Sequence, residues 1–215
     1  MALVNRLPKS GLYAITDPEL SHERGLRTCV QEALGAGAAM VQYRDKVASA
    51  EQRRERAKSL LDLCRRFDVP LIINDDVDLA KAIGADGVHV GRDDDAVPHA
   101  RATLGAHAIV GASCYHELPR AIRAVHEGAS YIAFGRFFPS HTKPGQALAS
   151  VELLAQARQQ IDVPIAAIGG ITASNGRPLV DAGASLLAVI HDLWCEADCA
   201  PRAQALIDCF NPARF

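Results

Sequence analysis

Acidic side chains follow apolar runs at two points of this 215-residue sequence. Asp75 and Asp76 come directly after one run, and Asp93 and Asp94 come shortly after the next. Carboxylate oxygens without a neighbouring His or Cys suit Mg²⁺, which keeps several waters and completes its shell with substrate phosphates. We therefore predict that Asp75 and Asp94 bind Mg²⁺, whereas Asp76 and Asp93 cap the helices that follow them.

Three cations accompany these carboxylates. Arg44 and Lys46 lie two residues apart in an extended segment, so both can face one pocket. Lys143 lies in a loop beside the hydroxyls of Ser140 and Thr142. Arginine offers a planar fork to phosphate oxygens and lysine a compact charge. We predict Arg44, Lys46 and Lys143 to be catalytic residues that bind an anionic group together with the metal.

A second anion site is predicted from backbone groups. Gly169-Gly170 and Ile190-His191 follow the last two apolar runs of the chain. Backbone N–H groups at a helix N-terminus can hold a phosphate without a cation, and barrel enzymes often use the last two strands for this purpose. Gly170 and the Ile190-His191 pair are therefore candidate phosphate contacts.

These residues must be positioned by a regular series of elements. Eight short apolar runs predict strands over 12–16, 40–43, 71–74, 87–90, 108–112, 131–135, 165–169 and 186–190. Helical segments are predicted over 26–34, 50–66, 77–83, 96–104, 118–127, 151–160, 174–182 and 198–209. Glycines in Gly-Ala pairs, as in Gly84-Ala85, end several helices just before a strand.

Alternating strands and helices predict a parallel sheet covered by helices. The predicted strands are apolar throughout, as expected when both faces of the sheet are buried. Eight units without a linker favour a closed (β/α)8 TIM barrel forming a single domain over residues 1–215. An open doubly wound sheet is the alternative. In a barrel, the polar residues after each strand would meet at one mouth.

Bulk properties exclude several classes of function. The sequence is 49% hydrophobic and 22% charged, with a formal net charge of −2. No basic field points to nucleic acid, and no apolar run of about 18 residues points to a membrane span. The N-terminus does not read as a signal peptide, and the six cysteines lack CxxC pairs, so we expect a cytoplasmic protein. The sequence leaves open whether a second copy of the chain binds to form a homodimer.

The C-terminal region offers an alternative metal site. His191, Cys195 and Cys199 follow one another at intervals of four, so they could share one face of a helix as ligands. We favour reduced thiols on a C-terminal helix instead. Cys114 is interpreted as a packing residue and not as a nucleophile, because no base is evident beside it.

Taken together, the strand ends resemble those of the thiamine phosphate synthase family from Leu12 to about Leu193. The resemblance is carried by the segments Leu12–Asp17, Val41–Lys46, Ile72–Asp75, His89–Asp94, Phe138–Pro144 and Ala167–Thr172. It implies two substrates, a 4-amino-2-methyl-5-(diphosphooxymethyl)pyrimidine and a thiazole phosphate, joined into thiamine phosphate with release of pyrophosphate. It also implies Mg²⁺ on Asp75 and Asp94.

The resemblance assigns the substrate contacts residue by residue. The residues implied for the pyrimidine diphosphate are Gln42, Tyr43, Arg44, Asp45, Lys46, Asn74, Ser113 and Lys143. Those implied for the thiazole phosphate are Ser140, His141, Thr142, Gly170, Ile190 and His191. Three positions depart from the family pattern: Arg92 replaces a common Gln, Ser140 a common Thr, and His191 a common Ser.

The resemblance implies that diphosphate leaves a pyrimidine methylene, which the thiazole nitrogen then attacks. Metal and cations would stabilise the leaving charge, and no protein nucleophile is required. Two rivals stay open. A thiazole tautomerase would resemble this chain in fold but would need neither the paired aspartates nor Lys143. An inactive sensor of phosphorylated ligands would not need the complete set of cations and carboxylates.

Overall fold

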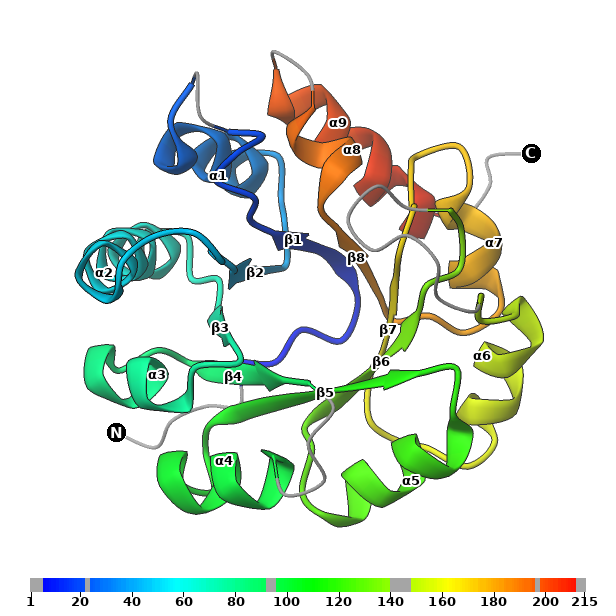
Figure 1. Ribbon diagram of the computed structural model, residues 1–215. Coiled ribbons are helices and arrows are strands. Elements are labelled where there is room, and N and C mark those ends of the chain that lie inside the picture. Colours follow the sequence, from blue (N-terminus) through cyan, green and yellow to red (C-terminus); the bar gives the residue numbers. More distant parts are fainter. Residues whose placement is uncertain (1–5, 22–23, 92–95, 140–147, 196–197, 212–215) are drawn as a thin grey trace.

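The chain folds into a closed parallel barrel surrounded by helices (Figure 1). This is a computed structural model, and it describes residues 6–21, 24–91, 96–139, 148–195 and 198–211. The strands are β1 (Gly11–Ile15), β2 (Met40–Tyr43), β3 (Leu71–Asn74), β4 (Gly87–Val90), β5 (Ile109–Tyr115), β6 (Tyr131–Gly135), β7 (Ile165–Ile168) and β8 (Leu186–Val189).

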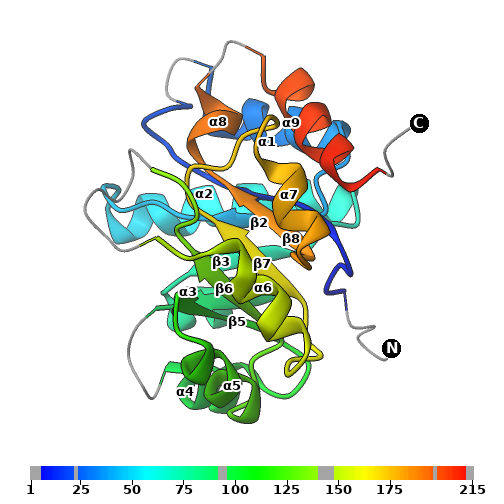
Figure 2. The ribbon, with the colours of Figure 1, turned by 90° about the vertical axis from the view of Figure 1, so that its right-hand side faces the viewer.

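Helices follow the strands in alternation. They are α1 (Leu26–Gly35), α2 (Ala50–Arg66), α3 (Val77–Ile83), α4 (Ala96–Leu104), α5 (Leu118–His126), α6 (Val151–Arg158), α7 (Gly176–Asp181), α8 (His191–Trp194) and α9 (Cys199–Ile207), with a 3-10 turn over Asp208–Phe210. Seen from the side, α6 and α7 lie along the outside of the barrel (Figure 2).

Ring closure decides between the two architectures that the sequence allowed. Each strand pairs in parallel with its sequence neighbour, and β8 pairs with β1 through Leu187 and Leu12. An open sheet would leave β1 and β8 at unpaired or unrelated edges. The predicted TIM barrel is therefore confirmed.

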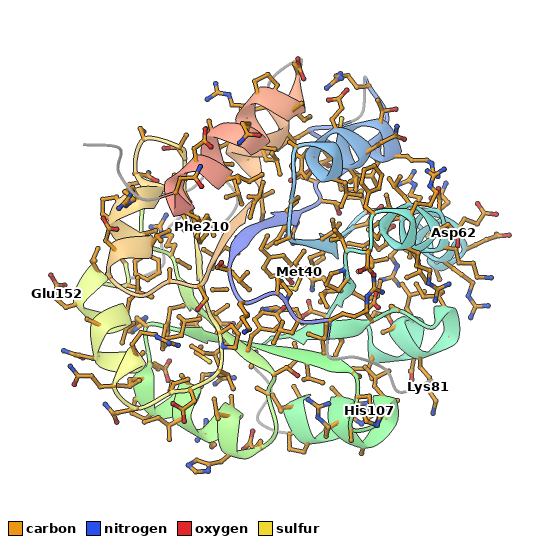
Figure 3. All side chains as sticks on the ribbon, turned by 180° about the vertical axis from the view of Figure 1, so that it is seen from behind. Met40, Asp62, Lys81, His107, Glu152 and Phe210 are labelled. Carbon is orange, nitrogen blue, oxygen red and sulfur yellow. The ribbon has the colours of Figure 1, made fainter. Side chains whose placement is uncertain are left out.

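The core has two layers. Inside the barrel, Tyr13, Met40, Ile72, Tyr131 and Leu186 are all nearly or completely buried. Figure 3, which views the molecule from the opposite side to Figure 1, shows Met40 in the centre of the ring. A larger cluster fills the space between strands and helices. Burial of both strand faces explains why the strands are apolar throughout.

The helix ends follow the signals in the sequence. Ser49 accepts a hydrogen bond from the backbone of Gln52, whose side chain binds the Ser49 N–H, so α2 begins with a capping box. Asp76 caps α3, as predicted, and Gly84 ends that helix at φ 67°. Such a φ is strained for residues with a side chain, which explains the glycine before β4.

The C-terminal region contains the predicted helix, as α9 and the 3-10 turn, and one short helix that the sequence did not predict. The segment after β8 forms a short helix, α8, and α9 begins separately at Cys199. His191, Cys195 and Cys199 therefore do not share one helix face. Trp194 of α8 donates from Nε1 to the carbonyl of Ile15 at 2.6 Å, so α8 is fixed against the end of β1.

No helix within the described part of the chain combines the length and apolar character that a membrane span requires.

Candidate functional site

A cavity of about 580 Å³ opens at the carboxyl ends of the strands. This is the end at which (β/α)8 barrels carry their ligands. We call it the mouth cavity. Its walls include Tyr13, Ile15, Gln42, Arg44, Lys46, Asn74, Asp75, His89, Gly91, Ser113, Tyr115, Ala133, Gly135, Arg136, Pro139, Ile168, Gly169, Gly170, Ile171, Thr172, Ala188, Val189, Ile190, His191 and Asp192.

Strand β2 and the residues after it divide into two sets. Gln42, Arg44 and Lys46 line the mouth cavity, whereas the intervening Tyr43 and Asp45 do not. Successive side chains of an extended chain point to opposite faces, which accounts for the alternation. Tyr43 instead packs in the outer core between the barrel and the helices.

Asp45 holds the loop that carries Lys46. Its carboxylate accepts hydrogen bonds from the N–H groups of Val47 and Ala48 and from the Tyr43 hydroxyl. Arg56 of α2 binds the same carboxylate at 2.8 Å. Burial favours a higher pKa for Asp45, but these donors outweigh it and lower the pKa below its ordinary value. Tyr43 and Asp45 therefore support the site from behind its wall.

Lys46 and Asp75 form an ion pair at the mouth. Lys46 Nζ lies 2.8 Å from Asp75 Oδ2, and the two side chains are 55% and 49% exposed. The Asp75 N–H donates to the carbonyl of His89, which ties the end of β3 to β4. A cation and a carboxylate thus lie together on the cavity wall, where both remain accessible to solvent and to a ligand.

Asp75 fits one part of a Mg²⁺ site. Within the residues that the structure describes, no three His, Cys, Asp or Glu side chains gather as a metal cluster. Mg²⁺ does not require such a cluster, because one or two carboxylates with waters and substrate phosphates complete its octahedron. Asp75 supplies one half-exposed carboxylate at the cavity. Asp94, the second predicted ligand, lies outside the described residues.

Arg44 is positioned through its backbone. The buried hydroxyl of Thr16 donates to the Arg44 carbonyl at 3.0 Å and accepts from the Arg44 N–H at 2.9 Å. These two bonds connect the ends of β1 and β2. They leave the guanidinium of Arg44 available on the cavity wall beside Lys46.

The opposite side of the cavity is built from backbone. Gly169 and Gly170 follow β7 at φ 103° and 64°, and a Cβ at Gly170 would collide with the carbonyl oxygen of Pro139. Asn175 fixes this loop, since its side chain accepts from the Thr172 N–H and donates to the Gly170 carbonyl. The loop needs glycine both for its conformation and for its close approach to residue 139.

Known proteins with this sequence pattern are numerous. The family model for thiamine monophosphate synthase matches residues 12–193. The chain belongs to this family. It is 51% identical to the thiamine-phosphate synthase of Azoarcus sp. (strain BH72), with 91% of this chain and 94% of the relative covered. It is 53% identical to that of Thiobacillus denitrificans, with 87% and 89% covered.

A solved structure of a family member has the same architecture. Thiamine phosphate pyrophosphorylase from Pyrococcus furiosus superposes with a TM-score of 0.84 at 32% identity, and the match covers 96% of each chain. The resemblance predicted from the strand ends is therefore confirmed at the level of family and fold.

Most described residues that the family resemblance assigned to ligands meet at the mouth cavity. Those that line it are Gln42, Arg44, Lys46, Asn74, Asp75, Ser113, Gly170, Ile190 and His191. They come from five different strand ends, so only the closed barrel brings them together. Ligand contact by each of them stays a prediction.

Several predicted site residues fall outside the described part of the chain. These are Asp94, Ser140, His141, Thr142 and Lys143, together with Arg92 and Asp93. Their assignments rest on the sequence alone.

Five polar wall residues were not singled out from the sequence, one of them Asp192. The other four are Tyr13, His89, Tyr115 and Arg136. A signal was available for His89, which precedes the wall residue Gly91 by two positions in an extended segment. It was not available for Tyr115, because the register shifts between Ser113 and Tyr115 and Tyr115 has a φ of 55°. Tyr13 and His89 belong to strands that otherwise read as core.

Proposed function

We propose that this protein is a thiamine phosphate synthase. It joins 4-amino-2-methyl-5-(diphosphooxymethyl)pyrimidine to thiazole phosphate and releases pyrophosphate. One observation carries the proposal: every described residue that lines the mouth cavity, from Tyr13 to Asp192, lies within the segment 12–193 that matches the family. The family likeness thus covers the whole described site and not merely the scaffold.

The proposed reaction exchanges one bond for another. The bond from the pyrimidine methylene carbon to the diphosphate oxygen breaks, and its electron pair leaves with the diphosphate. The lone pair of the thiazole nitrogen then forms a bond to the same carbon, which makes the reaction an alkyl transfer. An electron-rich aminopyrimidine can carry the positive charge that develops, so we propose a dissociative path. No protein nucleophile takes part.

Arg44 and Lys46 are proposed to stabilise the leaving group. Negative charge grows on the diphosphate as the bond breaks, and preorganised cations lower the energy of that state more than the energy of bound substrate. The ion pair with Asp75 holds the Lys46 side chain, and hydrogen bonds to Thr16 hold the Arg44 backbone. Both residues are therefore positioned before substrate arrives. We propose Lys143 as a third cation on sequence grounds.

Mg²⁺ is the proposed metal. Asp75 and Asp94 would hold it, and when bound it would neutralise charge on the diphosphate oxygens. The half-exposed Asp75 carboxylate offers oxygen atoms to the metal, and the neighbouring Lys46 offers a cation to the diphosphate. This pairing supports the proposal. A protein of one catalytic domain that works in the cytoplasm remains our expectation.

The thiazole phosphate is proposed to bind at the glycine side. Gly170, Ile190 and His191 line that side of the cavity, and the loop at Gly170 is fixed by Asn175. We assign the backbone N–H groups as the phosphate donors, with Ser140, His141 and Thr142 completing the contacts.

Incubation with both phosphorylated precursors and Mg²⁺ tests the proposal. Stoichiometric thiamine phosphate and pyrophosphate are expected. A thiazole tautomerase would instead interconvert thiazole phosphate isomers without consuming the pyrimidine, and an inactive sensor would bind one precursor without turnover. Either result would contradict the synthase assignment.

A further inference from the structure

A hydrogen-bonded chain of five side chains crosses the floor of the mouth cavity. We call it the floor chain, and its members in order are Gln42, Tyr13, Tyr131, His89 and Ser113. They come from five different strands, β2, β1, β6, β4 and β5. The four bonds measure 2.6, 2.7, 2.9 and 2.9 Å, within the range of ordinary hydrogen bonds.

The ends of the floor chain differ from its middle. Gln42, Tyr13, His89 and Ser113 all line the cavity, but the family resemblance assigns only Gln42 and Ser113 to the pyrimidine diphosphate. Tyr131 is completely buried beneath them. The three linking residues thus connect two ligand contacts without being assigned to a ligand themselves.

The fold makes room for this chain. Gly111 of β5 pairs with Tyr131 of β6, and a Cβ at Gly111 would collide with the Tyr131 ring and hydroxyl. The rings of Tyr13 and Tyr131 meet edge to face, with centroids 5.8 Å apart. The phenols are therefore held in one arrangement by packing as well as by hydrogen bonds.

The direction of the floor chain follows from its first bond. The distance between the Tyr13 and Tyr131 hydroxyls leaves the donor open. Because Gln42 Nε2 can only donate to the Tyr13 oxygen, Tyr131 is the bonded partner that can accept the Tyr13 proton. Tyr131, which accepts from Tyr13, then has Nδ1 of His89 as the bonded partner that can accept its own proton, and this decides the tautomer that the distance alone leaves open. An imidazole that accepts at Nδ1 is neutral and carries its proton on Nε2, which donates to Ser113 Oγ.

Both phenols keep their protons at ordinary pH. Burial raises the pKa of Tyr13 and of Tyr131 above the usual value, because a buried phenolate would lose its hydration. Each hydroxyl group therefore keeps one proton and donates one hydrogen bond. This condition is needed for the direction argued from the Gln42 amide.

The two ends then offer opposite groups to a ligand. Gln42 donates one N–H of its amide to Tyr13, and its carbonyl Oε1 is the one acceptor that the amide has for a ligand. Ser113 already accepts from His89, so its own hydroxyl proton can be donated to the cavity. One end accepts and the other donates, and the direction of the chain couples the two.

A 4-aminopyrimidine matches this pair. Its amino group donates, and the adjacent ring nitrogen accepts. A 4-oxopyrimidine presents the reverse, a carbonyl that accepts and a ring N–H that donates. A site that must hydrogen-bond one pattern rejects the other strongly, because its buried polar groups would be left unpaired.

We propose that Tyr13, Tyr131 and His89 are positioning residues that select an aminopyrimidine over an oxopyrimidine. They do so by fixing Gln42 as an acceptor and Ser113 as a donor. The proposal rests on the proposed function, since it specifies how that function recognises its pyrimidine.

The first test reads the direction of the floor chain without any substrate. Imidazole ¹⁵N spectra of the full-length protein report the protonation state of His89, whose signals are identified by their loss in His89→Gln. A neutral ring with the proton on Nε2 is expected. A proton on Nδ1, or a doubly protonated ring, would overturn the proposal even if the protein proves to be a synthase.

The second test measures selectivity. The kcat/KM ratio for the 4-amino substrate against its 4-oxo analogue is compared between the parent protein and Tyr131→Phe, which breaks the chain but keeps the ring. The ratio is expected to fall at least tenfold. Tyr13→Phe breaks the chain at another link and replaces Tyr131→Phe if that variant does not fold.

Ser185→Ala is the control. Its hydroxyl accepts from the Ile165 N–H at the start of β7, at the far end of the barrel, so it also loses one hydrogen bond. Its selectivity ratio should stay within twofold of the parent. An unchanged ratio in a folded Tyr131→Phe would refute the positioning role. If the parent makes no product, the proposed function fails, and the spectrum of His89 still decides the direction of the chain.

Discussion

Replacing Lys46 with alanine should separate catalysis from folding. The Lys46–Asp75 pair is about half exposed on both sides, and exposed ion pairs contribute about 0–1 kcal/mol to stability. A cation that meets charge developing in the transition state contributes about 3–4 kcal/mol. Lys46→Ala should therefore lower kcat by about a hundredfold to a thousandfold while unfolding changes by less than about 1 kcal/mol.

The assay follows pyrophosphate release with both substrates and Mg²⁺, and urea unfolding gives the stability. Lys81→Ala is the matched control, because Lys81 is an exposed lysine in the last turn of α3. It should leave kcat and KM unchanged. A Lys46→Ala effect confined to KM would place this cation in ground-state binding, and no effect would remove it from the reaction.

Four further outcomes are expected. Asp75→Ala should lower turnover at least a hundredfold with little change in stability, and full activity of this variant or of the parent in chelator would contradict the metal assignment. Gly170→Ala should raise the KM for thiazole phosphate more than tenfold, because φ 64° is strained by about 1–2 kcal/mol and the new Cβ meets Pro139; an unchanged KM would exclude a contact at this loop. His191→Ser should keep thiazole phosphate affinity within about threefold if only the backbone binds, and a tenfold loss by calorimetry would show that the imidazole contributes. The lowered pKa of Asp45 in the folded protein stabilises the fold above about pH 4, and this stabilisation is lost as the pH falls through the pKa of the folded state. The difference in unfolding free energy between the parent and Asp45→Asn, measured by urea unfolding, should therefore shrink as the pH falls. A difference that stays constant would refute the role of the ionised carboxylate.

The barrel itself could be predicted because its strands are short apolar runs separated by glycine turns and amphipathic helices. The predicted bounds of β2, β3 and β4 agree with the structure. Strand β5 extends further than expected, to Tyr115, whereas the prediction ended the strand at residue 112, before the polar Ser113. Ser113 and Tyr115 continue the strand with an irregular register against β6, and polar side chains there face the cavity and not the core.

The candidate site was predictable where a strand ends in charge. Arg44, Lys46 and Asp75 stand out for that reason, and all three line the cavity. Tyr43 and Asp45 were assigned by resemblance as a block with their neighbours, although the two-residue period of an extended chain turns them outward.

The floor chain could not be found from sequence. Tyr13, Tyr131 and His89 are far apart in the chain and lie within strands that otherwise carry apolar residues. Only ring closure brings their polar atoms within hydrogen-bonding distance across the barrel. A pattern along one strand contains no information about partners on four others.

The filled interior of the barrel has a consequence for molecular traffic. Tyr13, Met40, Ile72 and Leu186 close the space beneath the mouth cavity, so the described walls offer ligands one entrance. Two substrates and two products must then pass through the same opening of the mouth cavity. A ligand that enters through this opening must also leave through it, so bound product keeps the next substrate out until it is released. Thiamine phosphate should accordingly inhibit the reaction in steady-state kinetics.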